Sequence, residues 1–149
     1  MAGVALDGST IAPSTKAGHV TYTEWYQNGT DSWGYPIYLP AKRTTNAVIN
    51  GKASSNSHVK INGKSLLVQG DATSEHWVAD PYPQASPGGW VENIIPAPDG
   101  SGSGSGSVNN SGSHVKINGV PVALIGTGVT TCLGTSTTLN SGSDFVNVI

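Results

Sequence analysis

The chain is poor in charged side chains and in sulfur. Only 11% of its 149 residues are charged, and its seven basic residues are scattered within a net charge of −2. This composition excludes the basic patch of a protein that binds nucleic acid or an anionic membrane surface. One cysteine excludes an internal disulfide framework, so Cys132 is a buried thiol, a reactive thiol or a ligand.

Long apolar runs and helical periodicity are also absent. No stretch repeats apolar residues at the spacing of a helix, and none is long enough to span a bilayer. The N-terminus lacks the basic and apolar regions of an ordinary secretion signal, so we expect synthesis in the cytoplasm without a signal peptide. Abundant instead are 20 Gly, 9 Pro and short β-branched runs, which predict one all-β domain over residues 1–149 with many turns.

A seven-residue phrase, Ser-His-Val-Lys-Ile-Asn-Gly, occurs at 57–63 and again at 113–119. The same offset of 56 residues relates His76 to Cys132, which indicates a duplicated unit with His in one copy and Cys in the other. In each copy Asn-Gly predicts a tight hairpin turn, after which an apolar strand returns. The phrase Ser-Gly-Ser recurs at 141–143, where the repeat stops before its return strand.

These repeats divide the chain into segments. Residues 1–23 are interpreted as a weak first repeat, 46–77 as a clear repeat, and 113–149 as a second clear repeat. Residues 78–112 form a predicted Pro/Gly/Ser-rich insertion, in which 101–107 alternates Ser and Gly. That alternation predicts flexible coil, either a natural linker or an engineered one.

Aromatic residues concentrate in a predicted loop over residues 24–46. Three interpretations stay open for them: an interface to a partner protein, a sugar-stacking surface, or a small satellite core under a long loop. The residues concerned are Trp25, Trp33, Tyr35 and Tyr38.

The order of these motifs resembles the PAAR-repeat family, which forms the tips of contractile injection systems and phage tails. The motifs are Val-Lys-Ile-Asn-Gly-Lys, a returning apolar strand, Gly-Asp, and then His or Cys. Residues 118–126 are similar to the family's glycine-proline-alanine turn and strand, and Thr-Cys-Leu-Gly at 131–134 to its terminal cysteine. Gly-Thr replaces Gly-Asp at 126–127, and the four family-name residues form no block, which favours a PAAR-like relative from a phage or an extracellular injection particle.

The resemblance implies a small conical β-domain of short hairpin repeats with pseudo-threefold character and long irregular loops. Its base would sit on the blunt end of a trimeric β-helical spike, one tip per trimer. Its point would be pinned by a metal ion, usually bound by three His and one Cys. The implied role is structural: it sharpens the spike for puncture of the target-cell membrane, with effector cargo as a further option.

The predicted metal ligands are His19, His76 and Cys132, holding one zinc ion per chain, or alternatively iron. His19 supplies a third equivalent position if residues 1–23 are a repeat. The competing interpretations are exposed histidines and a small buried thiol. The fourth ligand stays open between His58, His114 and other residues.

His58 and His114 alternate out of phase with the apolar residues of their strands, as solvated side chains do. Asp144 falls at the same repeat position. His58, His114 and Asp144 could therefore instead form a second ring around the implied pseudo-threefold axis.

Two other classes of function compete with the structural tip. One is a glycan- or receptor-binding module that uses the aromatic loop. The other is an enzyme with Cys132 as nucleophile, but no activating partner lies near it in sequence, and no carboxylate pair or phosphate loop is present. We therefore predict that the chain is not an enzyme.

Overall fold

The computed structural model describes residues 2–148, and within this range the chain folds entirely into strands and turns. The prediction of an all-β fold is confirmed. Among these residues no helix is long and apolar enough to cross a membrane. The strands are β1 (Ala2–Gly3), β2 (Ser14–Thr30), β3 (Pro36–Ala53), β4 (Lys60–Ile61), β5 (Lys64–Ser65), β6 (Thr73–Asp80), β7 (Trp90–Ile95), β8 (Ser101–Gly104), β9 (Ser107–Val108), β10 (Lys116–Ile117), β11 (Val120–Pro121), β12 (Gly128–Thr130), β13 (Ser136–Thr138) and β14 (Asn147–Val148).

The strands belong to two compact units, and each is described by itself. Unit 1 comprises residues 2–14, 49–76 and 103–148, and unit 2 comprises Thr15–Val48 and Trp77–Gly102. The largest sheet has the order β7-β2-β3-β6-β8, and a smaller one has the order β13-β12-β9. That residues 1–149 form one domain stays a prediction.

The core of unit 1 is a ring of three backbone segments. Ala5 donates its N–H to the carbonyl of Ala123 at 2.9 Å, Ala123 to Leu67 at 2.8 Å, and Leu67 to Ala5 at 3.0 Å. All three residues are fully buried. Because the ring closes on itself after three steps, unit 1 has the pseudo-threefold character that the resemblance implied.

Each segment of the ring ends in the same turn. The N–H of one residue is bonded to a side-chain oxygen three positions later, at 2.8–2.9 Å, and the residue just before that oxygen is a glycine with φ between 89° and 96°. Such backbone conformations strain any residue with a Cβ, which explains glycine at this position. The three pairs are Leu6 with Ser9, Val68 with Asp71 and Leu124 with Thr127.

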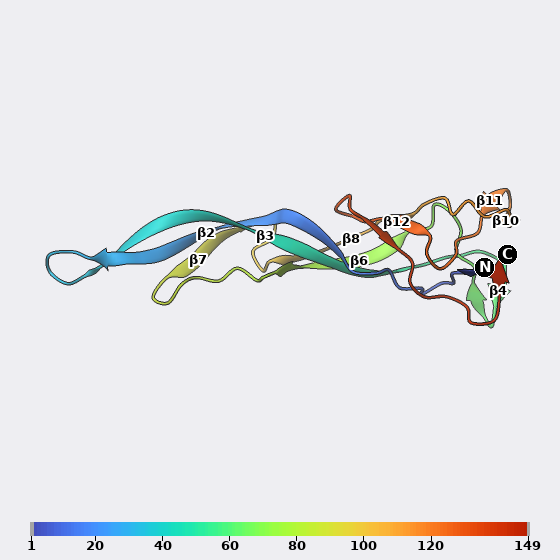
Figure 1. Cartoon of the computed structure of the whole chain (residues 1–149), viewed down its shortest axis with the longest axis horizontal. Coiled ribbons are helices and arrows are strands. Elements are labelled where there is room, and N and C mark those ends of the chain that lie inside the picture. The colour runs from blue at the N-terminus through green and yellow to red at the C-terminus, as the bar shows by residue number, and fades with distance from the viewer. Residues whose placement is uncertain (1, 149) are drawn as a thin grey trace. The chain divides into compact units, whose positions relative to one another are not determined.

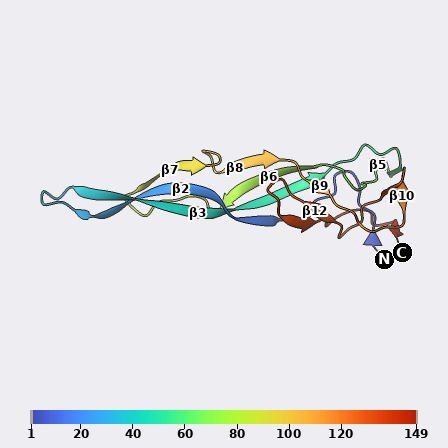
Figure 2. The same ribbon diagram turned by 90° about the horizontal axis from the view of Figure 1, so that it is seen from above.

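Each segment also carries a two-stranded ribbon. The ribbons β4–β5 and β10–β11 turn at Asn62-Gly63 and Asn118-Gly119, as the sequence predicts, with positive φ at all four residues. The third ribbon pairs β14 with β1, so that Ala2 lies opposite Val148. The repeat that stops at the C-terminus therefore receives its return strand from the N-terminus, and the two chain ends lie together in both views (Figure 1 and Figure 2).

The expected aromatic loop over residues 24–46 is wrong: the structure forms most of it into the hairpin of β2 and β3. Only a short turn, Asp31 to Tyr35, separates the two strands (Figure 1). Pro36 and Pro40 favoured a loop in the sequence. However, Pro36 begins β3, a position that proline tolerates.

The flexible coil expected at residues 101–107 is also corrected, because β8 and the start of β9 lie there. Its glycines face packed neighbours. A Cβ on Gly102 would lie 2.6 Å from the Trp77 indole within unit 2, and a Cβ on Gly104 would lie 2.8 Å from Cys132 Sγ within unit 1. The Ser/Gly alternation is therefore a strand whose bare backbone lets large side chains lie against it.

Candidate functional site

Three exposed apolar side chains occupy equivalent positions in the three repeats of unit 1. Each of these residues donates its backbone N–H, at 3.1–3.2 Å, to the hydroxyl of the serine two positions earlier, which is Ser57, Ser113 or Ser143. The side chains are Val59 (36% exposed), Val115 (40%) and Phe145 (78%). We call them the apolar triad. Each repeat contributes one residue to the ring of Ala5, Leu67 and Ala123 and one member to the triad. The triad therefore shares the pseudo-threefold character of the ring.

A buried polar cluster surrounds Cys132 in the same unit. The Glu75 carboxylate lies on the inward face of β6 and is almost completely buried. One of its oxygens accepts the backbone N–H of Cys132 at 2.7 Å, and the other accepts the hydroxyl of Thr73. The Thr73 hydroxyl in turn accepts the N–H of Gly106 at 2.8 Å. Hydrogen bonds thus compensate the burial of this acidic side chain.

The thiol of Cys132 is held in its protonated form. Burial raises its pKa to about 11, helped by the hydrogen bond and the negative charge of Glu75. A thiol protonated at neutral pH is a poor nucleophile, because the thiolate is the reactive species. The arrangement therefore gives Cys132 no activation for covalent catalysis.

His76 lies on the opposite face of β6 from Glu75, because residues alternate sides along a strand. Its ring is exposed, and Nδ1 is 3.4 Å from the hydroxyl of Ser103. It borders a shallow depression of about 680 Å³ within unit 1, which is also lined by Lys52 and Gly104.

His19 belongs to unit 2, where its ring packs edge-on against Trp77 at a centroid distance of 4.8 Å. Its Nε2 is buried and has no hydrogen-bond partner among the described residues. The repeat register places Ser14 at the position equivalent to His76 and Cys132, since each lies six residues after the glycine of its turn. The expectation that His19 fills the third equivalent position is therefore corrected.

His58, His114 and Asp144 do share one repeat position, each following the serine that frames the apolar triad. All three side chains are exposed. Across residues 2–148 no three side chains of His, Cys, Asp or Glu are grouped so that they could hold a metal ion. The ligand set of His19, His76 and Cys132, like the zinc or iron ion itself, stays a prediction.

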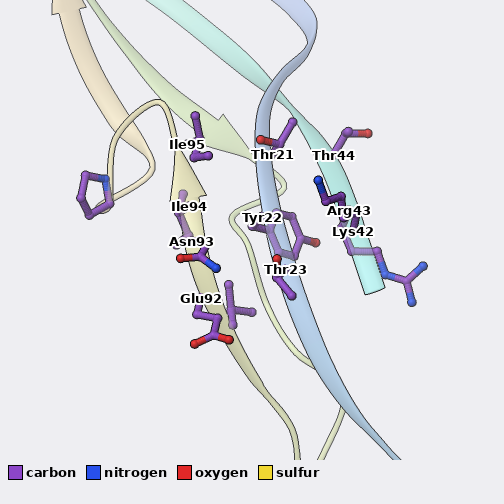
Figure 3. Close-up of a pocket in the computed structure, with 12 residues that line it drawn as sticks. Thr21, Tyr22, Thr23, Lys42, Arg43, Thr44, Glu92, Asn93, Ile94 and Ile95 are labelled. Carbon is purple, nitrogen blue, oxygen red and sulfur yellow. The ribbon is translucent and has the colours of Figure 1, made fainter. Parts of the chain in front are cut away.

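Unit 2 contains an open groove of about 850 Å³. Figure 3 shows Tyr22 of β2 with Asn93 and Ile94 of β7 on one side and Lys42 and Arg43 of β3 on the other. One additional residue on β7 opposite Tyr22 breaks the β2–β7 register, so the sheet bulges at the groove.

The buried Glu24 fastens a loop to the sheet of unit 2. Its carboxylate accepts the backbone N–H of Ser86 at 2.7 Å and the Ser86 hydroxyl at 2.9 Å, and it pairs with Arg43 Nε at 3.1 Å. The Ser86 hydrogen bonds, with the Arg43 pair, lower the pKa of Glu24 despite the opposing effect of burial. This interaction is structural, because the carboxylate is fully engaged within the unit.

The aromatic residues of unit 2 separate into two groups. Trp25 and Trp90 stack at 5.8 Å, the edge of Tyr38 meets Trp90 at 4.9 Å, and Glu92 accepts the indole N–H of Trp25. The three rings pack on one another at the surface of unit 2, where Trp90 is 44% exposed, so the satellite core stays a prediction for this group. Trp33 and Tyr35 at the turn are 82% and 68% exposed, and they pack into no such core.

Sequence reasoning missed the apolar triad and Glu75. The triad had a signal, since the serine two positions before each member recurs in all three repeats. Glu75 had none, because its partner Cys132 is 57 residues away. Comparison with protein-family models, with curated proteins and with solved structures found no match.

Proposed function

We propose that this chain is the structural tip of a contractile injection machine, seated through unit 1 on the blunt end of a trimeric β-helical spike. The proposal unites the PAAR-like motif order with the apolar triad. A threefold partner presents three identical surfaces around its axis, and the triad offers one apolar contact to each. The support is the repetition: an exposed apolar side chain recurs at the same position in all three repeats.

No catalytic step belongs to this role. Membrane puncture, a possible cargo and a pinning zinc or iron ion are part of the proposal as the resemblance implies them. Among the described residues no three His, Cys, Asp or Glu side chains are grouped to hold a metal ion, and the proposed docking through the triad does not depend on one.

The experiment is co-elution of the purified chain with a trimeric β-helical spike protein. Val59→Asp and Phe145→Asp should each weaken the complex, because a carboxylate would have to be desolvated in the interface. Val78→Asp is the matched control, since Val78 is an exposed apolar residue of unit 2 outside the triad. Equal binding by all three variants would overturn the proposal.

A further inference from the structure

The β2–β3 turn binds four of its five backbone N–H groups internally. The Asp31 carboxylate accepts the N–H of Trp33 and of Tyr35, both at 2.9 Å. Asp31 N–H donates to the Tyr35 carbonyl at 2.8 Å, and Gly34 N–H donates to the Asp31 carbonyl at 3.1 Å. These four hydrogen bonds make the turn a platform that leaves few backbone donors to bind water.

The side chains on this platform are aromatic and apolar. Trp33 and Tyr35 are the most exposed large hydrophobic side chains of unit 2, and Ile37 and Leu39 continue the exposed apolar series at alternate positions of β3. From residue 25 to residue 41, Asp31 is the sole charged residue, and its carboxylate is engaged in the turn. Across residues 25–41 this end of the hairpin therefore carries one charged group, the Asp31 carboxylate, which is hydrogen-bonded through Oδ1, and no basic residue.

We propose that the β2–β3 turn inserts into the interfacial region of a lipid bilayer, with Trp33 and Tyr35 as its anchors. Trp and Tyr prefer the headgroup level, because one end of each side chain is apolar and the other is polar. A backbone that enters a region poor in water must carry its hydrogen bonds with it, and this turn does so for four of its five N–H groups. The inference rests on the proposed function, for which it names the segment that meets the membrane.

The same features argue against a sugar as the occupant. A sugar-binding site combines an aromatic plane with free polar groups that fix the hydroxyls of the ligand. Here Oδ1 of Asp31 and four of the five turn N–H groups are already engaged in hydrogen bonds within the turn. Since no basic residue lies in the hairpin end, binding is expected without anionic lipid.

The test is flotation of the full chain with phosphatidylcholine vesicles, with tryptophan quenching by brominated phosphatidylcholine as a second readout. Replacing both anchors, Trp33→Ala with Tyr35→Ala, should lower the vesicle partition coefficient about tenfold or more. Quenching should disappear with them. Because both side chains are exposed, circular dichroism and the melting temperature should not change.

Phe145→Ala is the matched control, since Phe145 is as exposed as the anchors but lies in unit 1. It should weaken spike binding and leave vesicle binding intact, whereas the double variant should do the reverse. If the double variant has the same vesicle partition coefficient as the unmodified chain and both still bind the spike, the membrane inference is overturned and the proposed docking role is not. The membrane inference would also be overturned if vesicle binding required phosphatidylglycerol. The same holds if the chain bound purified polysaccharide through Trp33 and did not bind vesicles.

Discussion

The backbone N–H of Cys132 donates a 2.7 Å hydrogen bond to the carboxylate of Glu75, 57 residues earlier in the chain. This bond ties the inward face of β6 to the segment that follows β12. Gly106 completes the cluster by donating to Thr73, so a stretch with the composition of a linker closes over a buried carboxylate. The cluster makes the Ser/Gly tract a part of the fold.

Gly106→Val should destabilise the chain. A Cβ at this position would collide with the carbonyl oxygen of Thr130 and with the Glu75 carboxylate. Overpacking of this kind costs about 1–3 kcal/mol in the free energy of unfolding, measured by urea denaturation. Ser105→Val is the control, because Ser105 is exposed and adjacent. If both variants unfold at the same urea concentration, the tract is not packed as described.

The Cys132 thiol should react slowly with a disulfide reagent at pH 7 to 8 in chelator-treated protein. Its pKa is raised to about 11, so little thiolate is present near neutrality. Glu75→Gln removes the negative charge beside the thiol and should speed the reaction. The labelling is followed by absorbance. Rapid labelling of the unmodified chain would contradict a protonated Cys132 thiol beside Glu75 and would support a nucleophilic cysteine.

Because of Glu24, the free energy of unfolding should vary with pH in the acidic range. Its pKa lies below the usual 4.5 in the folded chain, because Ser86 and Arg43 favour the carboxylate. The folded state therefore binds this proton more weakly than the unfolded chain does. The contribution to stability is complete above pH 4.5 and is lost as the pH falls through the folded-state pKa.

Melting temperatures of the unmodified chain and of Glu24→Gln measure this contribution. Above pH 4.5 the unmodified chain should be the more stable of the two, and the gap should narrow as the pH is lowered. A gap that stays constant down to pH 2 would mean that Glu24 does not titrate as described.

Metal analysis tests the predicted ligands. If the resemblance extends to the metal, purified protein holds one zinc or iron ion per chain, and His76→Ala and Cys132→Ser release it. His58→Ala serves as the control for an exposed histidine in the same unit. Folded, metal-free protein with an intact thiol would remove the metal from the account while leaving the docking role to be judged by itself.

The hairpins could be predicted because their signals are local, and the duplication because its two copies share the same residues. Asn62-Gly63 and Asn118-Gly119 specify tight turns wherever they stand between apolar strands. The closure of the third ribbon could not be predicted this way, because Ala2 and Val148 pair across the chain ends without any turn between them. The prediction for His19 depends on residues 1–23 being a repeat with His19 at its ligand position, whereas the register that selects Ser14 becomes visible only through the three turns.

The predictions from composition were wrong for two segments, the Ser/Gly tract and the aromatic segment, because packing and sheet pairing decide their conformation. Alternating Gly and Ser is the composition of a flexible linker, whereas in the fold this segment pairs with β6 and β12, and Trp77 and Cys132 lie against its glycines. The aromatic segment was interpreted as a loop because prolines interrupt it, yet its β-sheet pairing persists on both sides of the turn.

The stoichiometry of the complex with a trimeric β-helical spike tests the central claim most directly. Native mass spectrometry should find one copy of this chain per spike trimer, because a single pseudo-threefold triad occupies the end of one threefold axis. Three copies per trimer, or no complex at protein concentrations in the micromolar range, would contradict the account.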